Sequence, residues 1–572
     1  METLEKIDKS LTVCKISTTV QDISEKVFSS CDSLESIECD SDYFKSIDGV
    51  LFTADYKTLV RYPPKKNGTD YVVPNSVVNI GSYAFRNCEF LEHIILPDSL
   101  INIGESAFSR CKSLQDIILP DSITKICRDT FMLCQSLKKI KLPNSLTEIG
   151  NSAFMYCKAL QEIDLPNTLS EIGSCIFSNC SSLRRINISV SLNYIPKYAF
   201  ANCSKLKRIT LPNSIKHIES GAFSRCNFLR EIKLSKELID IDSSAFSSCK
   251  LLNEIELPNG IESINDGAFW GCESLETISL PNSIQHIGNN TFGFCPSLEK
   301  IECDNEYYYT VDGVLFDKKD KKLVRYPQGR TERKYTIPNG ILIIGQAAFG
   351  NCCDLEEIIL PESVKILKSD AFHSCSKLKS IKLPNQISSI APSAFFYCWD
   401  LKGIECDSPF FKSINGVLFT ADLKTLVCYP QGKGCDNYVV PDSVTNIAED
   451  AFCSFVSPWT ADSCKRITLP KSINEITDTT FEHHKSLKWI ECDNEHYKSI
   501  DGVLFTADCK TLVYYPRGRE DSQYIIPDTV TKIENRAFAS NSYLRKIIIP
   551  KGRMEDFIEM FPEDNEYELA EA

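Results

Sequence analysis

Residues 97–120 read PDSLINIGESAFSRCKSLQDIILP, and the same pattern starts again at Pro120 with a period of 23 residues. The shared form is L-P-x-S-L-x-x-I-x-x-x-A-F-x-x-C-x-x-L-x-x-I-x. Seventeen copies begin at Ser17, Pro74, Pro97, Pro120, Pro143, Pro166, Ser189, Pro212, Ser235, Pro258, Pro281, Pro338, Pro361, Pro384, Pro441, Pro470 and Pro527. A short fixed period indicates a solenoid, in which each unit buries its apolar face only against its neighbours. We therefore predict one repeat solenoid.

The last residues of each copy predict a β-strand. Over 114–119 the apolar and polar residues alternate, which places Ile117 and Leu119 on one face and Asp116 and Ile118 on the other. Pro120 lacks an N–H and suits the end of the strand. Stacked copies therefore predict a long parallel sheet, closed from the opposite side by inward residues such as Ile103, Ala107, Phe108, Cys111 and Leu114.

Four longer coils of 34 residues interrupt the array, at 40–73, 304–337, 407–440 and 493–526. The first contains YFKSIDGVLFTADYKTLVRYP, in which the Asp-Gly pair predicts a type I′ turn between two apolar strands. We predict that each longer coil is a small β-meander that projects from the solenoid and returns as the next rung. The coil from Pro441 to Pro470 carries six extra residues.

The 27 cysteines follow the repeat. Fourteen stand at the same repeat position, namely 31, 88, 111, 134, 157, 180, 203, 226, 249, 272, 295, 352, 375 and 398. Cys39, Cys303, Cys406 and Cys492 replace the inward leucine of a strand. A free cysteine packs as a small buried hydrophobe, so these residues predict a core ladder of free thiols. The clustered cysteine pairs of a metal site are missing, and we predict no bound metal.

Three regions are predicted along the chain. Residues 1–16 form an N-terminal cap and the first strand, residues 17–550 form the solenoid, and residues 551–572 form a capping helix and an acidic tail. Met554, Phe557, Ile558 and Phe561 have helical spacing, so the helix is expected over 552–561. Residues 563–572 are expected to be disordered.

With these motifs in view, the unit LPxSLxxIGxxAFxxCxxLxxI resembles the BspA-type leucine-rich repeat over residues 11–550. The D-G-V-L-F…L-V-x-Y-P coils are also similar to companions of that family. The resemblance implies a leucine-rich-repeat horseshoe with a long parallel β-sheet. It also implies likeness to surface antigens and adhesins of gut and oral bacteria and of parasitic protists, which bind host matrix proteins or other cells. It supplies no catalytic residue and no cofactor.

Composition and motifs exclude several functions. The net charge of −14 argues against a protein that binds nucleic acid by neutralising phosphates. The sequence contains no run of 18 apolar residues, so we predict no membrane insertion. The first 16 residues lack the pattern of a secretory signal. The sequence has no H-E-x-x-H, G-x-S-x-G or phosphate-loop motif. We predict no enzyme activity and no cofactor, and expect all seven histidines to be solvated or at the rim.

The outward positions of the strands are candidate partner-binding sites, because they line the predicted concave face. Their charges alternate in sign along the stack, and the candidates are Lys139, Lys141, Arg185, Arg208, Glu254 and Glu256. Neighbouring rungs of opposite charge can pair across the sheet. The same residues therefore fit either a self-neutralising soluble face or a charged binding site.

The C-terminal third contains a second group of candidates. Trp489 stands at an outward strand position, with Arg466 one rung before it, and Trp459 lies in the six-residue insertion. Exposed tryptophan and arginine are the residues that carry most binding energy in protein interfaces. Local packing against the loop is the alternative role for both tryptophans.

The sequence therefore predicts a monomeric, non-enzymatic scaffold that recognises an unidentified protein ligand. Adhesin-like binding of host or cell-surface proteins follows from the family resemblance. The alternative is an intracellular protein–protein scaffold, which follows because no secretory signal is predicted and many free thiols are expected. Two locations stay open accordingly: the cytoplasm, and the cell surface or exterior.

Overall fold

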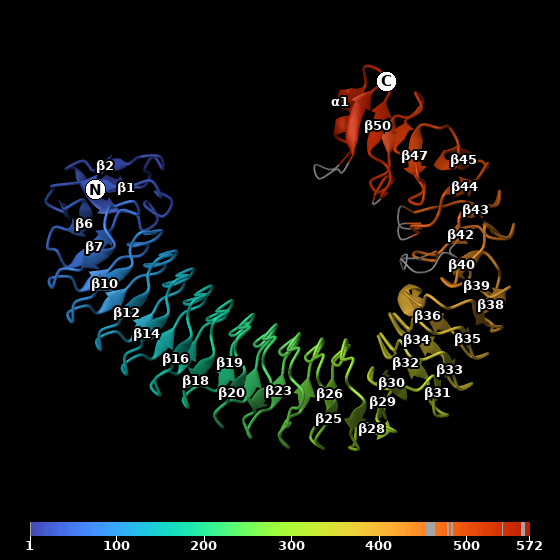
Figure 1. The fold of residues 1–572 in the computed structure, drawn as a ribbon, viewed down its shortest axis with the longest axis horizontal. Helices are drawn as coiled ribbons and strands as arrows, with labels where there is room; N and C mark the ends of the chain where they lie inside the picture. The colour runs from blue at the N-terminus through green and yellow to red at the C-terminus, as the bar shows by residue number, and fades with distance from the viewer. Residues whose placement is uncertain (1, 453–463, 478–479, 482–483, 540, 562–566) are drawn as a thin grey trace. The chain divides into compact units, whose positions relative to one another are not determined.

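The computed structural model describes residues 2–452, 464–477, 480–481, 484–539, 541–561 and 567–572. The chain forms two compact units, residues 1–307 and residues 308–572. In each unit short strands succeed one another along the chain and stack as parallel rungs (Figure 1). This arrangement confirms the predicted repeat solenoid.

The main ladder of the first unit consists of the strands that end each coil. Partners lie 23 residues apart, as in the register that pairs Ile117 with Ile140 and Ile163 with Ile186. The central residue of these strands is buried, except for the half-buried Tyr71 of β8, and its two neighbours face solvent, because successive side chains alternate across a strand. The strands are β2 (Val13–Lys15), β4 (Ser36–Glu38), β8 (Asp70–Val72), β10 (His93–Ile95), β12 (Asp116–Ile118), β14 (Lys139–Lys141), β16 (Glu162–Asp164), β18 (Arg185–Asn187), β20 (Arg208–Thr210), β22 (Glu231–Lys233), β25 (Thr277–Ser279) and β27 (Lys300–Glu302).

A second ladder of two-residue strands runs along the same unit, and its inward residue is usually isoleucine. In register, Ile149 pairs with Ile172. The strands are β9 (Asn79–Ile80), β11 (Asn102–Ile103), β13 (Lys125–Ile126), β15 (Glu148–Ile149), β17 (Glu171–Ile172), β19 (Tyr194–Ile195), β21 (His217–Ile218), β23 (Asp240–Ile241), β24 (Ser263–Ile264) and β26 (His286–Ile287).

The second unit repeats both ladders. Its main ladder comprises β31 (Lys334–Thr336), β33 (Glu357–Ile359), β35 (Ser380–Lys382), β37 (Gly403–Glu405), β41 (Asn437–Val439), β43 (Arg466–Thr468), β44 (Trp489–Glu491), β48 (Gln523–Ile525), β50 (Lys546–Ile549) and β51 (Glu568–Glu571). Its second ladder comprises β32 (Ile343–Ile344), β34 (Ile366–Leu367), β36 (Ser389–Ile390), β42 (Asn446–Ile447) and β49 (Lys532–Ile533). A short 3-10 helix, η1 (Pro392–Phe395), follows β36.

Each longer coil contains an antiparallel meander of three strands. The four meanders are β5 (Phe44–Ile47), β6 (Val50–Thr53) and β7 (Thr58–Arg61); β28 (Tyr308–Val311), β29 (Val314–Asp317) and β30 (Lys322–Arg325); β38 (Phe411–Ile414), β39 (Val417–Thr420) and β40 (Thr425–Cys428); and β45 (Tyr497–Ile500), β46 (Val503–Thr506) and β47 (Thr511–Tyr514). The expectation that they project is wrong. In the first meander, β7 pairs in parallel with β9, and Phe52 and Leu59 are buried. The apolar strands of the meander join the second ladder because their side chains are buried there.

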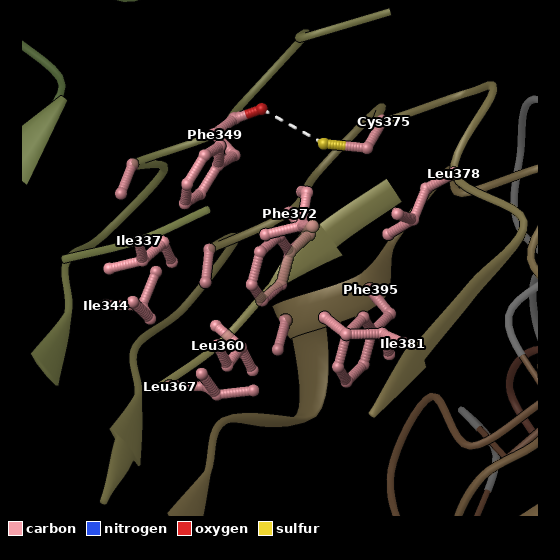
Figure 2. Packing of buried hydrophobic residues seen from close by; sticks show 14 of the residues in the cluster. Ile337, Ile344, Phe349, Leu360, Leu367, Phe372, Cys375, Leu378, Ile381 and Phe395 are labelled. Atoms are coloured by element: carbon pink, nitrogen blue, oxygen red, sulfur yellow. Dashed lines mark hydrogen bonds between the residues drawn. The ribbon is translucent and has the colours of Figure 1, made fainter. Parts of the chain in front are cut away.

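A stack of phenylalanine rings forms the centre of the core. In the first unit Phe108 is fully buried, and its ring stacks on Phe85 at 5.0 Å and on Phe131 at 5.4 Å. The second unit repeats the stack with Phe349, Phe372 and Phe395 (Figure 2). Offset contact between aromatic rings stabilises such a column beyond the burial of its area.

The ladder cysteines are buried beside this stack. All eighteen cysteines at the two ladder positions are less than a tenth exposed. In most of the regular coils the thiol donates to the carbonyl of a phenylalanine one coil back, as Cys375 Sγ does to Phe349 O at 3.2 Å (Figure 2). The packing prediction for these residues is therefore confirmed. One expectation for the histidines is wrong: His484 takes the ladder position and is 1 % exposed, because the repeat places that side chain in the core.

The ends of the chain differ from the prediction. At the start, β1 (Glu2–Leu4) pairs in parallel with β3 (Val20–Ile23). At the end, α1 (Met554–Ile558) is shorter than the expected 552–561 helix. The expectation of disorder is wrong for the last residues, because β51 pairs in parallel with β50. Leu569 packs against the core of the last coils, which gives this acidic segment an apolar anchor.

Candidate protein-binding surface

Three neighbouring rungs of the first unit carry apolar side chains on the solvent side of the main ladder. Val72, Ile95 and Ile118 stand at the last position of β8, β10 and β12, and they are 63 %, 63 % and 69 % exposed. Val72 and Ile95 are register partners, and β12 is the next rung of the same four-stranded sheet. Neighbouring rungs are about 4.8 Å apart, so the three side chains form one continuous surface. We call these residues the apolar stripe.

The apolar stripe has polar neighbours on two sides. Along the rungs it is accompanied by the row Asp70, His93 and Asp116, in which His93 Nδ1 lies 3.4 Å from Asp116 Oδ1. At one end, Ile118 pairs in register with Lys141 of β14. The surface is therefore an apolar centre with a charged rim, as in protein interfaces.

The predicted charged positions lie on several rungs of the same unit, and Arg185 and Arg208 stand on the successive strands β18 and β20. Arg185 contacts two carboxylates of the preceding rung, Glu162 at 3.5 Å and Asp164 at 3.2 Å. Exposed pairs of this kind contribute about 0–1 kcal/mol. This contact is a self-neutralising one, and within the described residues no ion pair involves Lys139, Lys141, Arg208, Glu254 or Glu256.

Glu254 and Glu256 correct one detail of the prediction. Both are exposed, and Ile255 between them is buried, but residues 254–256 are assigned to no strand. The preceding rung places Glu231 one repeat before Glu254. The coil of Glu254 therefore keeps the inward and outward pattern of the ladder without a strand of its own.

In the second unit Arg466 and Trp489 come together as predicted neighbours. Arg466 on β43 and Trp489 on β44 are register partners, and the guanidinium lies 4.9 Å from the centre of the indole. Arg519 approaches the same ring at 6.0 Å. Arginine above an aromatic face is a favourable cation–π contact.

Trp489 is half-buried, whereas the prediction has it exposed. The reason is the turn of the fourth meander. A Cβ atom on Gly502, which has φ +75°, would lie 2.5 Å from Cδ2 of the indole, so the ring packs closely over this glycine. Arg519 is held in place by Asp501 at 2.9 Å and by Asp521 at 2.5 Å. Both roles considered for this tryptophan, local packing and presentation to a partner, are therefore available to it.

Trp459 lies outside the described residues. The sequence predicts the Asp501-Gly502 turn, but it does not indicate Arg519 or the packing of the indole over Gly502. A signal existed in the repeats, because Lys66, Arg330 and Arg519 each stand 18 residues after the first residue of the meander turn. Each donates to the carbonyl of that residue. In three of the four long coils, a lysine or arginine side chain thus donates a hydrogen bond to the turn.

Two further features concern metal binding and membrane insertion in the described part of the chain. Among the residues that the structure describes, no group of three or more histidine, cysteine or acidic side chains could hold a metal ion. No helix in that part of the chain has the length and apolar character needed to cross a bilayer.

The chain belongs to the BspA-type leucine-rich repeat family. The family model matches six times, at residues 6–59, 64–158, 124–253, 225–331, 328–428 and 427–551. Proteins of this leucine-rich repeat class are binding scaffolds. A comparison with curated proteins gave no match.

Solved structures of leucine-rich repeat proteins are similar to this chain. A leucine-rich repeat protein from Bacteroides ovatus is 22 % identical, with a TM-score of 0.46, and the match covers 93 % of this chain and 99 % of that one. A leucine-rich cell surface protein from Faecalibacterium prausnitzii is 23 % identical, with a TM-score of 0.37 and coverage of 79 % and 95 %. A T. pallidum leucine-rich repeat protein is 29 % identical, with a TM-score of 0.27 and coverage of 38 % and 90 %.

Proposed function

We propose that this protein is a non-enzymatic recognition scaffold that binds a host or cell-surface protein through the solvent side of its main ladder, as an adhesin does. The apolar stripe is the observation that carries the proposal. Val72, Ile95 and Ile118 are each more than 60 % exposed on three neighbouring rungs. A contiguous exposed apolar surface with a polar rim is typical of a protein interaction site.

The energy available from this surface is sufficient for recognition. Full burial of one valine or isoleucine side chain is worth about 1.5–3 kcal/mol. The three side chains stand on hydrogen-bonded strands and are β-branched, so little conformational entropy is lost when a partner covers them. The rim of Asp70, His93, Asp116 and Lys141 can set the orientation of the partner through complementary charge.

The cluster of Arg466, Trp489 and Arg519 is a second candidate surface for the same function. Arginine and tryptophan are enriched among the residues that dominate binding energy. Both guanidinium groups lie near the indole, and a partner would contact mainly Arg466 and Trp489, because the Arg519 side chain is only 11 % exposed. This surface and the apolar stripe belong to different units, and each can be tested by itself.

The alternative function is an intracellular protein–protein scaffold. The ladder thiols favour it, because in most regular coils the thiol proton is used in a hydrogen bond to the core, as between Cys111 Sγ and Phe85 O at 3.0 Å. A fold that uses reduced cysteines in this way suits a reducing compartment. Cell fractionation combined with a thiol count separates the two functions.

The binding test uses the full chain and a panel of purified host matrix proteins, with affinity measured by biolayer interferometry. The variant Ile95→Asp/Ile118→Asp places two charges in the apolar stripe. Its matched control is Thr210→Asp, which adds a charge at the same exposed strand position on β20. We expect the double variant to weaken binding at least tenfold and the control to leave it unchanged.

Two results would redirect this proposal. Equal affinity of all three proteins for a matrix partner would show that the apolar stripe is not the binding surface. If no matrix protein binds but a cytoplasmic partner does so in a stripe-dependent manner, the scaffold alternative is the correct one.

A further inference from the structure

The position two residues before each main-ladder strand forms a buried leucine ladder, and this ladder is broken once among the seventeen coils. Sixteen coils carry leucine there: Leu34, Leu91, Leu114, Leu137, Leu160, Leu183, Leu206, Leu229, Leu252, Leu275, Leu298, Leu355, Leu378, Leu401, Leu487 and Leu544. The remaining coil of the seventeen, which also carries the six extra residues, has Cys464, which is 1 % exposed. Cysteine is smaller than leucine, so this coil departs from the packing of the other sixteen at this position.

The neighbouring rung contains a second departure. In the second and fourth long coils the equivalent residue is acidic and accepts a hydrogen bond from a tyrosine, as Asp521 Oδ2 does from Tyr515 Oη at 2.9 Å. In the third long coil the residue is Cys435, and its Sγ lies 3.1 Å from Tyr429 Oη. Two cysteines thus replace two different residue types on adjacent rungs.

These two cysteines face each other. Cys464 Sγ lies 3.2 Å from Cys435 Sγ. Each stands two residues before its strand, and β41 and β43 pair in parallel with Asn437 opposite Arg466. Adjacent rungs are about 4.8 Å apart, which is within the Cα separation of disulfide-linked residues. Cys464 Sγ also lies 3.0 Å from the carbonyl oxygen of Arg466 in its own coil, whereas the ladder thiol of Cys375 donates to Phe349 O one coil back.

We propose that Cys435 and Cys464 are a redox-active thiol pair that a low-molecular-weight disulfide, such as oxidised glutathione, converts to an intramolecular disulfide. The Cys435 thiolate attacks one sulfur of the oxidant and releases one thiolate. Cys464 then attacks the mixed disulfide, loses its proton and expels the second thiolate. Two protein thiols give up two electrons, and one molecule of the disulfide becomes two thiols.

The surroundings assign the attacking role to Cys435. The contact with the Cys464 thiol, together with the Tyr429 hydroxyl and the charge of Lys433, holds the pKa of Cys435 below its ordinary value against the effect of burial. Cys435 is also only half-buried, so an oxidant can reach it. The hydrogen bond with Cys435 and burial raise the pKa of Cys464, which suits the second, resolving thiol.

The disulfide would tie two rungs of the second unit to each other. It would lie two residues before Arg466, whose side chain contacts Trp489. Oxidation would therefore lock the start of β43 against the start of β41. The inference does not depend on the identity of a binding partner.

The test treats the native full chain with oxidised glutathione, blocks remaining thiols with N-ethylmaleimide, and maps linked peptides by non-reducing mass spectrometry. Trypsin leaves Cys435, Cys453 and Cys464 on one peptide, because it cleaves after Lys433 and Lys465. Chymotrypsin is therefore added to separate them, and the experiment is repeated with Cys453→Ser. We expect a link between Cys435 and Cys464 in both proteins, reversed by dithiothreitol, while the ladder cysteines stay reduced.

The variant Cys464→Leu restores the leucine of the other coils and serves as the matched control. It should fold, as judged by an unchanged circular dichroism spectrum, and should accumulate glutathione on Cys435 because the resolving thiol is missing. A link from Cys435 to Cys453 in place of Cys464, no link in either protein, or ladder cysteines that oxidise as fast as Cys435 would each overturn the proposal.

Discussion

Removal of one ring from the phenylalanine stack tests how this core is stabilised. Phe108 is fully buried and has a ring neighbour on each side, Phe85 at 5.0 Å and Phe131 at 5.4 Å. Phe108→Ala removes about 3–5 kcal/mol of stability through lost burial and a residual cavity. Because two stacked contacts are lost together, we expect about 4–5 kcal/mol.

The loss should be local, because each coil of a solenoid contacts only its neighbours. Hydrogen exchange followed by mass spectrometry reports this directly. Peptides that contain Phe85 and Phe131 should exchange about a thousandfold faster, since each 1.4 kcal/mol corresponds to a factor of ten. Peptides from the second unit should be unchanged.

Phe228→Ala is the matched control for this prediction. Phe228 is 49 % exposed in the same array, so its removal should change stability by about 0.5 kcal/mol or less. If both variants have the same exchange rates and the same urea midpoint, the stacked core is not the source of stability that we infer.

Three further predictions follow from burial and charge. Burial lowers the pKa of His484 to about 4, so its contribution to stability is complete above about pH 6.5 and is lost as the pH falls toward 4. The urea midpoint of the His484→Cys variant should therefore depend less on pH across this interval than that of the unchanged protein. Equal dependence in the two proteins would contradict the assignment. Burial raises the pKa of Cys111, which should react with iodoacetamide slowly in the folded chain, whereas exposed Cys353 should react at once; equal rates in mass spectrometry would show that the ladder is open to solvent. Trp489→Ala should weaken a partner that binds this cluster by about 2 kcal/mol or more in calorimetry, and an unchanged affinity would assign the tryptophan to packing alone.

Much of this fold was predictable because the repeat makes one observation many times. The alternation around Ile117 recurs in coil after coil, so the repeated pattern identifies the inward and outward faces of the strands. The same reasoning placed Phe108 and Cys111 in the core, where they are buried. It also placed Arg466 beside Trp489, because neighbouring rungs share a register.

Other features depend on contacts that the repeat period does not encode. The half-burial of Trp489 is set by Gly502 and Arg519, which lie 13 and 30 residues further along the chain. The segment after residue 566 reads as an acidic tail, yet Leu569 finds the core and the strand β51 forms around it. The short-range sequence pattern predicts neither the burial of Trp489 nor the strand β51.

The amino-acid sequence alone determined that this chain is a parallel-strand solenoid of the BspA-type leucine-rich repeat class, because a period of 23 residues brings like side chains into register and only stacking can bury them. Only the tertiary structure decided which exceptions to the repeat meet. Val72, Ile95 and Ile118 become one surface, and Cys435 meets Cys464, because adjacent rungs bring residues 23 or 29 positions apart to within side-chain contact. The repeat creates the fold, and its departures, once stacked, create the candidate sites.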